Sequence, residues 1–379
     1  MSPHPHVAVC GGGLIGTSLA LALAAAGRAV RVHDCDPAVR AALSGRTTGL
    51  DVSVAEDWGS AAEGAAIVVA AVPPAVIPGV LAEAAPLARQ DALLTDVAGV
   101  KGAVVRSVAA ALDAIPGASE RYVGGHPMAG SERSGPQAGD GALFTGATWV
   151  LTPTGTSSDA ALAVASDLAR ALGARVLVLS PEEHDTIVGL VSHLPQLVAS
   201  VLADVAAEAV GADRDAIMAV AGPGFRDTTR IAASDPALWL DIVDGNRDAI
   251  GPALAVFQSR LEEVRQAVVA RDAAALDAVL RRASASRRRL VPKGIDDPTR
   301  DLVVPLRDRP GEIARIAGAL GSAGVNIEDL AMRHAAAADR GSLLLRVRAD
   351  AAERAVHVLE QVDVRGVMLE AAQETGGEG

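Results

Sequence analysis

The feature that most constrains the fold is a glycine-rich segment between an apolar run and an apolar helix. The run Val7–Cys10 leads into Gly11-Gly12-Gly13-Leu14-Ile15-Gly16, and a helical stretch from Thr17 to Ala26 follows. In such a segment the first glycine permits a tight turn, the second lets a pyrophosphate approach the backbone, and the third packs helix on strand. The helix N-terminus supplies N–H donors to the phosphates. The segment therefore predicts a dinucleotide-binding βαβ unit.

An acidic residue stands where the second strand of that unit should end. Asp34 follows Gly16 at roughly the 20-residue spacing of the motif. A carboxylate there accepts hydrogen bonds from a ribose hydroxyl and repels a 2′-phosphate, which favours NAD over NADP. Arg31 and Arg40 leave the strictness of that choice open, and Asp34 could also be only a turn residue. The residues that we expect to contact the cofactor are Gly11, Gly13, Leu14, Ile15, Gly16, Asp34, Val72 and Asp96.

Strand-like apolar runs alternate with helical stretches from Val7 to about Leu179. Continuous apolar runs such as Ile67–Val72 are typical of parallel strands that helices cover on both faces. The alternation predicts an α/β, doubly wound, Rossmann-type domain over residues 1–179. The expected strands are Val7–Cys10, Ala29–Asp34, Ala66–Val72, Leu93–Val97, Tyr122–Gly124, Thr148–Thr152 and Arg175–Leu179.

The hydrophobic period becomes helical from about Ser180 onward. Apolar residues from Ile187 to Val205 follow i, i+3, i+4, i+7 spacing, which indicates an amphipathic helix. Pro195 should cost this helix a hydrogen bond and kink it near Val191. Further helices are expected at 214–219, at 236–265 with a break near Gly251, and at 273–289. Residues 180–291 therefore form a predicted all-α domain.

The pattern changes once more after a linker at residues 293–298. Predicted strands at 302–306, 325–333, 342–347 and 367–371 alternate with predicted helices at 311–323 and 351–361. This βαββαβ order predicts a small ferredoxin-like α+β domain over residues 299–373.

The chain is acidic, with a formal net charge of −12. This charge argues against a nucleic-acid-binding surface, and an anionic ligand would need a local basic cluster. Cys10 and Cys35 are too few for a disulfide framework and are interpreted as buried thiols. Three prolines interrupt the uncharged segment Gly64–Ala82, so a strand and a loop explain it better than a membrane span. We expect a cytoplasmic protein without a signal peptide, a membrane span or a metal site.

Three side chains outside the glycine-rich turn are candidates for chemistry. His126 follows a strand of the cofactor domain, where a neutral histidine could accept a hydroxyl proton while hydride leaves the same carbon. His193 lies between apolar residues and could equally be a hydrogen-bonded core histidine. Arg230 lies among small or apolar residues, which suits bidentate recognition of a carboxylate or a structural salt bridge.

Five ordered motifs together resemble the prephenate/arogenate dehydrogenase (TyrA) family. They are GGGLIG (11–16), DVAGVKG (96–102), GGHPMAGSERSG (124–135), SHLPQ (192–196) and GFRDTTRIAASDPALW (224–239). The resemblance covers roughly residues 7–289. It implies a homodimeric enzyme of tyrosine biosynthesis that converts prephenate to 4-hydroxyphenylpyruvate. In that reaction the ring carbon gives hydride to NAD, and loss of a ring carboxylate as CO2 makes the ring aromatic.

The resemblance also implies roles for individual residues. His126 would take the proton from the ring hydroxyl, and Arg230 would bind a substrate carboxylate with Glu132 orienting it. Trp239 lies where the family places a residue that is contributed across a helical dimer interface. The expected substrate-binding residues are Ser131, Glu132, His193, Arg226, Arg230 and Trp239.

One departure from the family pattern is Gly99. Many members have a serine there that is hydrogen-bonded to the catalytic histidine, so a water or a backbone carbonyl would have to fix the tautomer of His126. The departure favours a second hypothesis, a catalytically silent protein that binds NAD and an amino acid. Arogenate differs from prephenate only in its side chain, so it stays open as the substrate. A different hydroxyacid dehydrogenase with a helical second domain is a third hypothesis.

The C-terminal unit resembles an ACT domain. Asp308-Arg309-Pro310-Gly311 lies at its first strand–helix turn, and Gly324-Val325-Asn326-Ile327 opens its second strand. In ACT domains this turn and strand commonly bind an amino acid between two copies. Feedback by tyrosine is therefore a hypothesis, and the unit could instead be a purely structural or dimerising appendage. The residues expected to bind the effector are Asp308, Pro310, Gly311, Asn326 and Ile327.

Overall fold

The computed structural model describes residues 5–130, 133–209, 220–290, 299–307, 309, 311–334 and 340–369. The chain divides into two compact units, residues 1–263 and residues 264–379. The first unit holds the predicted cofactor domain and most of the predicted helical domain. The second unit holds the end of the helical domain and the predicted ferredoxin-like sheet.

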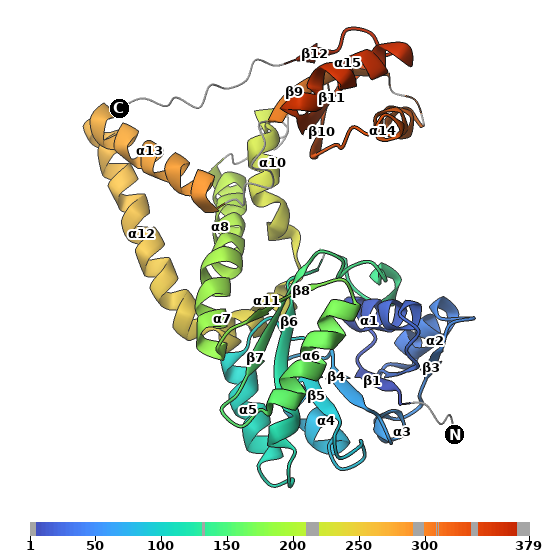
Figure 1. The fold of residues 1–379 in the computed structure, drawn as a ribbon. Helices are drawn as coiled ribbons and strands as arrows, with labels where there is room; N and C mark the ends of the chain where they lie inside the picture. The colour runs from blue at the N-terminus through green and yellow to red at the C-terminus, as the bar shows by residue number, and fades with distance from the viewer. Residues whose placement is uncertain are drawn as a thin grey trace. The chain divides into compact units, whose positions relative to one another are not determined.

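The first unit is built on an eight-stranded sheet with helices on both faces (Figure 1). The strand order is β3-β2-β1-β4-β5-β6-β7-β8. All seven predicted strands are present, and the short edge strand β3 is an addition. The strands are β1 (Val7–Cys10), β2 (Val30–His33), β3 (Val52–Val54), β4 (Ile67–Ala70), β5 (Leu93–Asp96), β6 (Tyr122–Pro127), β7 (Thr148–Pro153) and β8 (Arg175–Val178).

The direction of β7 departs from the expected parallel sheet. Strands β1 to β6 are parallel, whereas β7 runs antiparallel to β6 and β8 follows the direction of β7. A parallel neighbour usually requires a crossover helix. In its described part, the connection from β6 to β7 contains only the single 3-10 turn η2 (Pro136–Ala138), so the antiparallel direction follows.

Alternate residues of each inner strand face opposite hydrophobic cores. Ala8 and Val68 pack into the core under α3, α4 and α5, while Val7 and Ile67 pack into the core under α1, α2 and α6. Burial on both faces explains why these strands are continuous apolar runs. The helices are α1 (Leu14–Ala25), α2 (Pro37–Arg46), α3 (Trp58–Ala62), α4 (Ile77–Ala84), α5 (Gly102–Leu112) and α6 (Asp159–Ala171), with a 3-10 turn η1 (Ser119–Arg121).

The predicted amphipathic helix contains a π-helical turn. Helix α7 (Pro181–Val188) continues through the π-helix η3 (Gly189–His193) into α8 (Leu194–Ala209). Pro195 has no N–H to donate to the carbonyl four residues earlier, and the wider π turn lies at the place where the kink was expected. Among the described residues, the stretch Pro181–Glu208 is the one helix whose length and composition would let it cross a membrane, and core helices of soluble proteins share both properties.

The expected helix at 214–219 lies outside the described residues, and the next helix with described bounds begins at Pro223. The expected break near Gly251 is wrong: helix α11 ends at Gly245, and Gly251 lies inside α12. The break falls at Asn246, whose side chain is buried and hydrogen-bonded to two partners in other elements. The elements are α10 (Pro223–Thr229), the 3-10 turn η4 (Arg230–Ala233), α11 (Pro236–Gly245) and α12 (Arg247–Ala270).

The second unit contains α13 (Ala273–Leu290) and a four-stranded antiparallel sheet of order β10-β11-β9-β12. The chain order of strands and helices is βαββαβ, as expected, although β10 begins four residues later than predicted. Ile316 and Leu359 from the two helices pack on Leu302, Val304 and Leu345 of the sheet. The elements are β9 (Thr299–Arg307), α14 (Glu312–Ser322), β10 (Asp329–His334), β11 (Arg340–Arg348), the 3-10 turn η5 (Ala349–Ala351), α15 (Ala352–Gln361) and β12 (Met368–Leu369).

Candidate active site

The glycine-rich turn leaves open space at the N-terminus of α1. Gly11 has φ +103°, and a Cβ on it would lie 2.1 Å from the carbonyl oxygen of Ala71. A Cβ on Gly16 would lie 1.8 Å from the carbonyl oxygen of Gly11, so both positions exclude any side chain. Gly13, the N-cap of α1, has no neighbour within 4 Å of its Cβ position. A pyrophosphate can therefore approach the first N–H groups of the helix at Gly13.

Asp34 lies beside this turn, just after the end of β2. Its carboxylate accepts hydrogen bonds from the N–H of Gly12 at 2.7 Å and of Asp36 at 2.9 Å. Arg40 donates to the carbonyl oxygen of Asp34 and pairs with Glu56 at 3.5 Å. A carboxylate at this position repels a 2′-phosphate, and Arg40 already has partners of its own. NAD is the cofactor that this cradle fits.

Asp96 is the buried counter-ion of Lys101, and its expected contact with the cofactor stays a prediction. Both side chains are fully buried and form an ion pair. The carboxylate of Asp96 also accepts hydrogen bonds from the Tyr122 hydroxyl and from the N–H of Ala98, both at 2.8 Å. Lys101 also donates a hydrogen bond to the carbonyl oxygen of Gly125 at 2.6 Å. This ammonium therefore fixes the backbone immediately before His126, a role that the sequence did not indicate.

His126 belongs to strand β6, since the strand extends past its predicted end to Pro127. The imidazole is partly buried, and its Nδ1 lies 2.8 Å from Nε2 of His184. Nδ1 of His184 in turn lies 2.8 Å from the Asp185 carboxylate. Burial lowers the pKa of His126 well below 6.5, and the nearby Lys101, His184 and His193 lower it further. His126 is therefore neutral at physiological pH, as a general base must be.

Gly99 faces the other side of the His126 ring. A Cβ built on Gly99 would lie 3.7 Å from Nε2 of His126, so a serine hydroxyl at this position would come within hydrogen-bonding reach. The partner of the ring's Nδ1 is a side chain, His184, and not the water or backbone carbonyl that we expected. The sequence signal that could have indicated this contact is the adjacent pair His184-Asp185 in the first turns of α7.

Backbone N–H groups at the N-terminus of α5 stabilise the carboxylate of Asp185. The N–H groups of Lys101 and Gly102 donate to the two oxygens of the carboxylate at 2.8 and 2.7 Å. Burial raises the pKa of Asp185, but the hydrogen bonds from His184 and from these two N–H groups outweigh it, so the pKa is lowered overall. Asp185 is therefore an ionised, buried carboxylate.

His193 ends the π-helical turn and is buried. Its Nδ1 lies 3.1 Å from Nδ2 of Asn246, which also donates to the carbonyl oxygen of Asp185 at 2.8 Å. Burial lowers the pKa of His193 to about 4, so the ring is neutral. Because Asn246 donates to Nδ1, the ring hydrogen is on Nε2. The ring of Trp239 lies edge-on to His193 in the same chain, with centroids 5.8 Å apart, and its role across a dimer interface stays a prediction.

Two of the remaining predicted substrate contacts, Arg226 and Arg230, lie on one segment, α10 and η4. Helix α10 and the turn η4 pack on α8, where Gln196 donates to the carbonyl oxygen of Ile231 at 2.9 Å. Arg226 and Arg230 are exposed on this segment, and their contact with substrate stays a prediction. Ser131 and Glu132 lie outside the described residues, so the predicted Glu132–Arg230 contact is untested.

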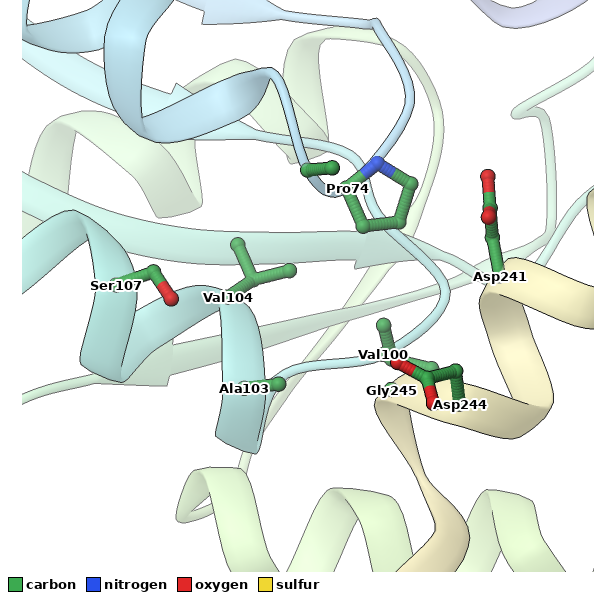
Figure 2. A pocket seen from close by; sticks show the side chains of 9 residues that line it. Pro74, Val100, Ala103, Val104, Ser107, Asp241, Asp244 and Gly245 are labelled. Atoms are coloured by element: carbon green, nitrogen blue, oxygen red, sulfur yellow. The ribbon is translucent and has the colours of Figure 1, made fainter.

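A pocket of about 170 Å³ lies between α5, α11 and the loop after β4 (Figure 2). Val100 and Val104 form one wall, and the carboxylates of Asp241 and Asp244 line another. No predicted site residue lines this pocket. Its two carboxylates would repel an anionic ligand, so the surroundings of His126 remain the candidate active site.

Comparisons with known proteins show the family to which the chain belongs. Residues 19–178 match the family model of the prephenate dehydrogenase nucleotide-binding domain, and residues 180–282 match that of the prephenate dehydrogenase dimerization domain. A cyclohexadienyl dehydrogenase from Zymomonas mobilis is 34% identical over 272 residues, which cover 72% of this chain and 91% of that protein.

Two solved structures are also similar. Prephenate dehydrogenase from A. aeolicus, in complex with hydroxyphenyl propionate and NAD+, is 27% identical with a TM-score of 0.68 and covers 76% of this chain and 99% of its own. Arogenate dehydrogenase from Synechocystis is 27% identical with a TM-score of 0.64, and the match covers 76% of this chain and 100% of that structure's chain. These matches, with the dinucleotide cradle after β1 and the neutral histidine near the end of β6, lead to one conclusion: the chain belongs to the prephenate dehydrogenase family of NAD-dependent dehydrogenases.

Proposed function

We propose that the protein is a prephenate dehydrogenase of tyrosine biosynthesis, which converts prephenate to 4-hydroxyphenylpyruvate. The observation that carries this proposal is the state of His126. The ring is neutral, hydrogen-bonded through Nδ1 to His184, and near open backbone at Gly99 on its Nε2 side. A substrate hydroxyl at that nitrogen finds a base that cannot rotate without losing its hydrogen bond.

The chemistry of the reaction sets what His126 has to do. The hydroxyl proton moves to Nε2 of His126 as the ring carbon loses hydride and its C–O bond becomes a carbonyl. Bound NAD supplies the hydride acceptor. The ring carboxylate then leaves as CO2, and the electron pair of the broken C–C bond makes the ring an aromatic phenolate. Return of the proton from His126 gives the phenol, so the enzyme holds this proton only between the two steps.

Neutral and cationic groups of the site suit a substrate with two carboxylates. The Nε2–H of His193 is a neutral donor, and Arg230 and Arg226 supply positive charge that the acidic chain lacks overall. We assign Arg230 to a substrate carboxylate, with Glu132 orienting it, and Ser131 and Trp239 to further contacts. Val72 is assigned to the cofactor because it follows β4 at the same edge of the sheet as the glycine-rich turn.

Arogenate is the second candidate substrate, because the similar Synechocystis structure is of an arogenate dehydrogenase. The experiment measures the initial rate of NADH formation with each substrate, and of NADPH formation when NADP replaces NAD. We expect the larger kcat/KM for prephenate with NAD. Absence of activity on both substrates would refute the proposal and favour a silent binding protein. Unchanged kcat in a His126→Asn variant would exclude His126 as the base.

We further propose that the enzyme is a cytoplasmic homodimer formed through its helical domain. The matched family model is a dimerization domain, and helix α8 exposes Val201, Leu202 and Val205. An exposed apolar stripe of this kind is typical of an interface. Light scattering should give twice the mass of the 38.3 kDa chain. A Val201→Glu/Val205→Glu variant should be monomeric, and a dimeric variant would exclude this face.

Tyrosine regulation through an ACT-like C-terminal domain completes the proposal. Gly311 has φ +89° and caps α14, and the amide of Asn326 donates to Glu328 at 2.9 Å in the segment before β10. Asp308 and Pro310 lie outside the described residues, and Ile327 packs partly against the core of the unit. We expect tyrosine to inhibit the wild type and to inhibit Asn326→Ala at least tenfold more weakly. Equal inhibition would remove Asn326 from the effector site.

A further inference from the structure

A hydrogen-bonded chain of three side chains ends on the proposed base. Asp185, His184 and His126 are joined by two contacts of 2.8 Å each. An ionised carboxylate can only accept, so His184 donates its Nδ1–H to Asp185. A neutral His184 then presents a lone pair at Nε2, and the contact with His126 requires the hydrogen to be on Nδ1 of His126. Nε2 of His126 is left as the unprotonated nitrogen.

Burial protects the hydrogen bonds between these three side chains from exchange with water. His184 is fully buried and Asp185 is 8% exposed, so bulk water cannot replace either partner. The N–H groups at the start of α5 hold the carboxylate, and Asn246 holds the backbone carbonyl of the same residue. The chain is therefore anchored at its far end by backbone from another element.

We propose that His184, held by Asp185, is the positioning residue that sets the tautomer of His126 and stabilises its protonated form, in place of the serine absent at Gly99. This inference rests on the proposed function. When His126 takes the substrate proton at Nε2, its Nδ1–H remains donated to His184. The new positive charge is then stabilised by the fixed negative charge of Asp185 through the polarised ring of His184. No proton needs to leave the chain, since the same proton returns to the phenolate.

The other charged and titratable groups around His126 act against its protonation. Positive charge on Lys101, His184 or His193 lowers the pKa of His126, and the negative charge of Asp96 is already paired with Lys101. While the Nδ1–H of His184 is donated to Asp185 and its Nε2 accepts from His126, the His184 ring carries no net charge and does not add that repulsion. Among the described residues near the ring, Asp185 is the carboxylate that a hydrogen-bonded path joins to His126. Removal of His184 should therefore damage proton transfer more than substrate binding.

The first test reads the tautomers directly, without turnover. Long-range 15N–1H correlation spectra of the full-length protein with labelled histidine distinguish a protonated ring nitrogen from an unprotonated one. We expect Nδ1–H and unprotonated Nε2 for both His126 and His184 at pH 7.5, assigned with His126→Asn and His184→Gln. The Nε2–H tautomer at His126 would overturn the proposal.

The second test removes the positioning ring. His184→Phe keeps an aromatic ring in the buried space but has no nitrogen, and His184→Gln keeps an amide oxygen that can accept from His126. The matched control is His6→Phe. His6 is also buried and hydrogen-bonded, but its partner is the carbonyl oxygen of Ala61 and not a residue of the proposed site. We expect kcat to fall by about 10²-fold or more in His184→Phe and less in His184→Gln, with KM for both substrates within about threefold.

The outcomes separate this inference from the proposed function. An inactive wild type would refute the proposed function before the variants are compared. An active wild type with kcat within twofold in His184→Phe would overturn the positioning role and leave the function intact. Equal losses in His184→Phe and His6→Phe would also overturn it, because the loss would then come from the fold. Melting temperatures and the Kd for NAD identify variants that fail to fold.

Discussion

Replacement of Lys101 by methionine tests whether the buried ion pair with Asp96 holds the catalytic strand in place. Methionine fills most of the space of the lysine stem but removes the ammonium. Asp96 would then keep its hydrogen bonds from Ala98 and Tyr122, both at 2.8 Å, with no positive partner. The carbonyl oxygen of Gly125, next to His126, would lose its donor as well.

The magnitude follows from the burial of both groups. Each is 0% exposed, and removal of one partner of a buried pair costs about 3–5 kcal/mol because the other charge stays uncompensated. This is a large part of a total stability of about 5–15 kcal/mol. For a unit of this size, a loss of about 4 kcal/mol lowers the melting temperature by roughly 10 °C.

Circular dichroism melting of the full-length variants measures this effect. Lys101→Met combined with Asp96→Asn removes the stranded charge and should recover part of the loss. Arg89→Met is the matched control, because Arg89 pairs with Asp91 at 2.9 Å on the surface and should leave the melting temperature nearly unchanged. The reasoning is refuted if Lys101→Met melts within about 2 °C of the wild type, or if the double variant is no more stable than the single one.

Three further predictions concern the cofactor and pH. Gly13→Ala should leave the melting temperature unchanged, because its Cβ meets no protein atom, but should weaken NAD binding about tenfold, because the methyl group would occupy the space of the pyrophosphate. Calorimetric titration measures the Kd for NAD, and an unchanged affinity would contradict this prediction. Asp34→Ser should reduce kcat/KM with NAD and raise it with NADP, and a parallel fall with both would argue against 2′-phosphate repulsion. His193 has a pKa of about 4 when folded and 6.5 as its ordinary value, so the unfolded chain binds more protons between these values. Unfolding free energy in urea should therefore fall as pH drops from 6.5 to 4, by roughly 2 kcal/mol after solvent screening, and less in His193→Gln.

Local sequence patterns predicted the cofactor fold because they depend on neighbouring residues alone. Apolar alternation located the strands, and the glycine spacing located the turn before α1. The position of Asp34 beside the turn could be predicted because the acid and the turn belong to one βαβ unit. Local patterns do not show which side chains are paired in the interior, and the buried pair of Asp96 with Lys101 was therefore not predicted.

His126 is thus a residue that the sequence identified and that only the tertiary structure explained. Its motif pointed to a base, but the residue expected to orient it is Gly99. The orienting groups come from α7, and Asp185 is anchored by N–H groups of Lys101 and Gly102, which lie more than 80 residues earlier. Such contacts arise from packing of α5 against α7, which no local period encodes. The sequence by itself determined the cofactor fold and singled out His126 as the proposed base, whereas tertiary packing decides which groups surround that ring, because those groups come from distant elements.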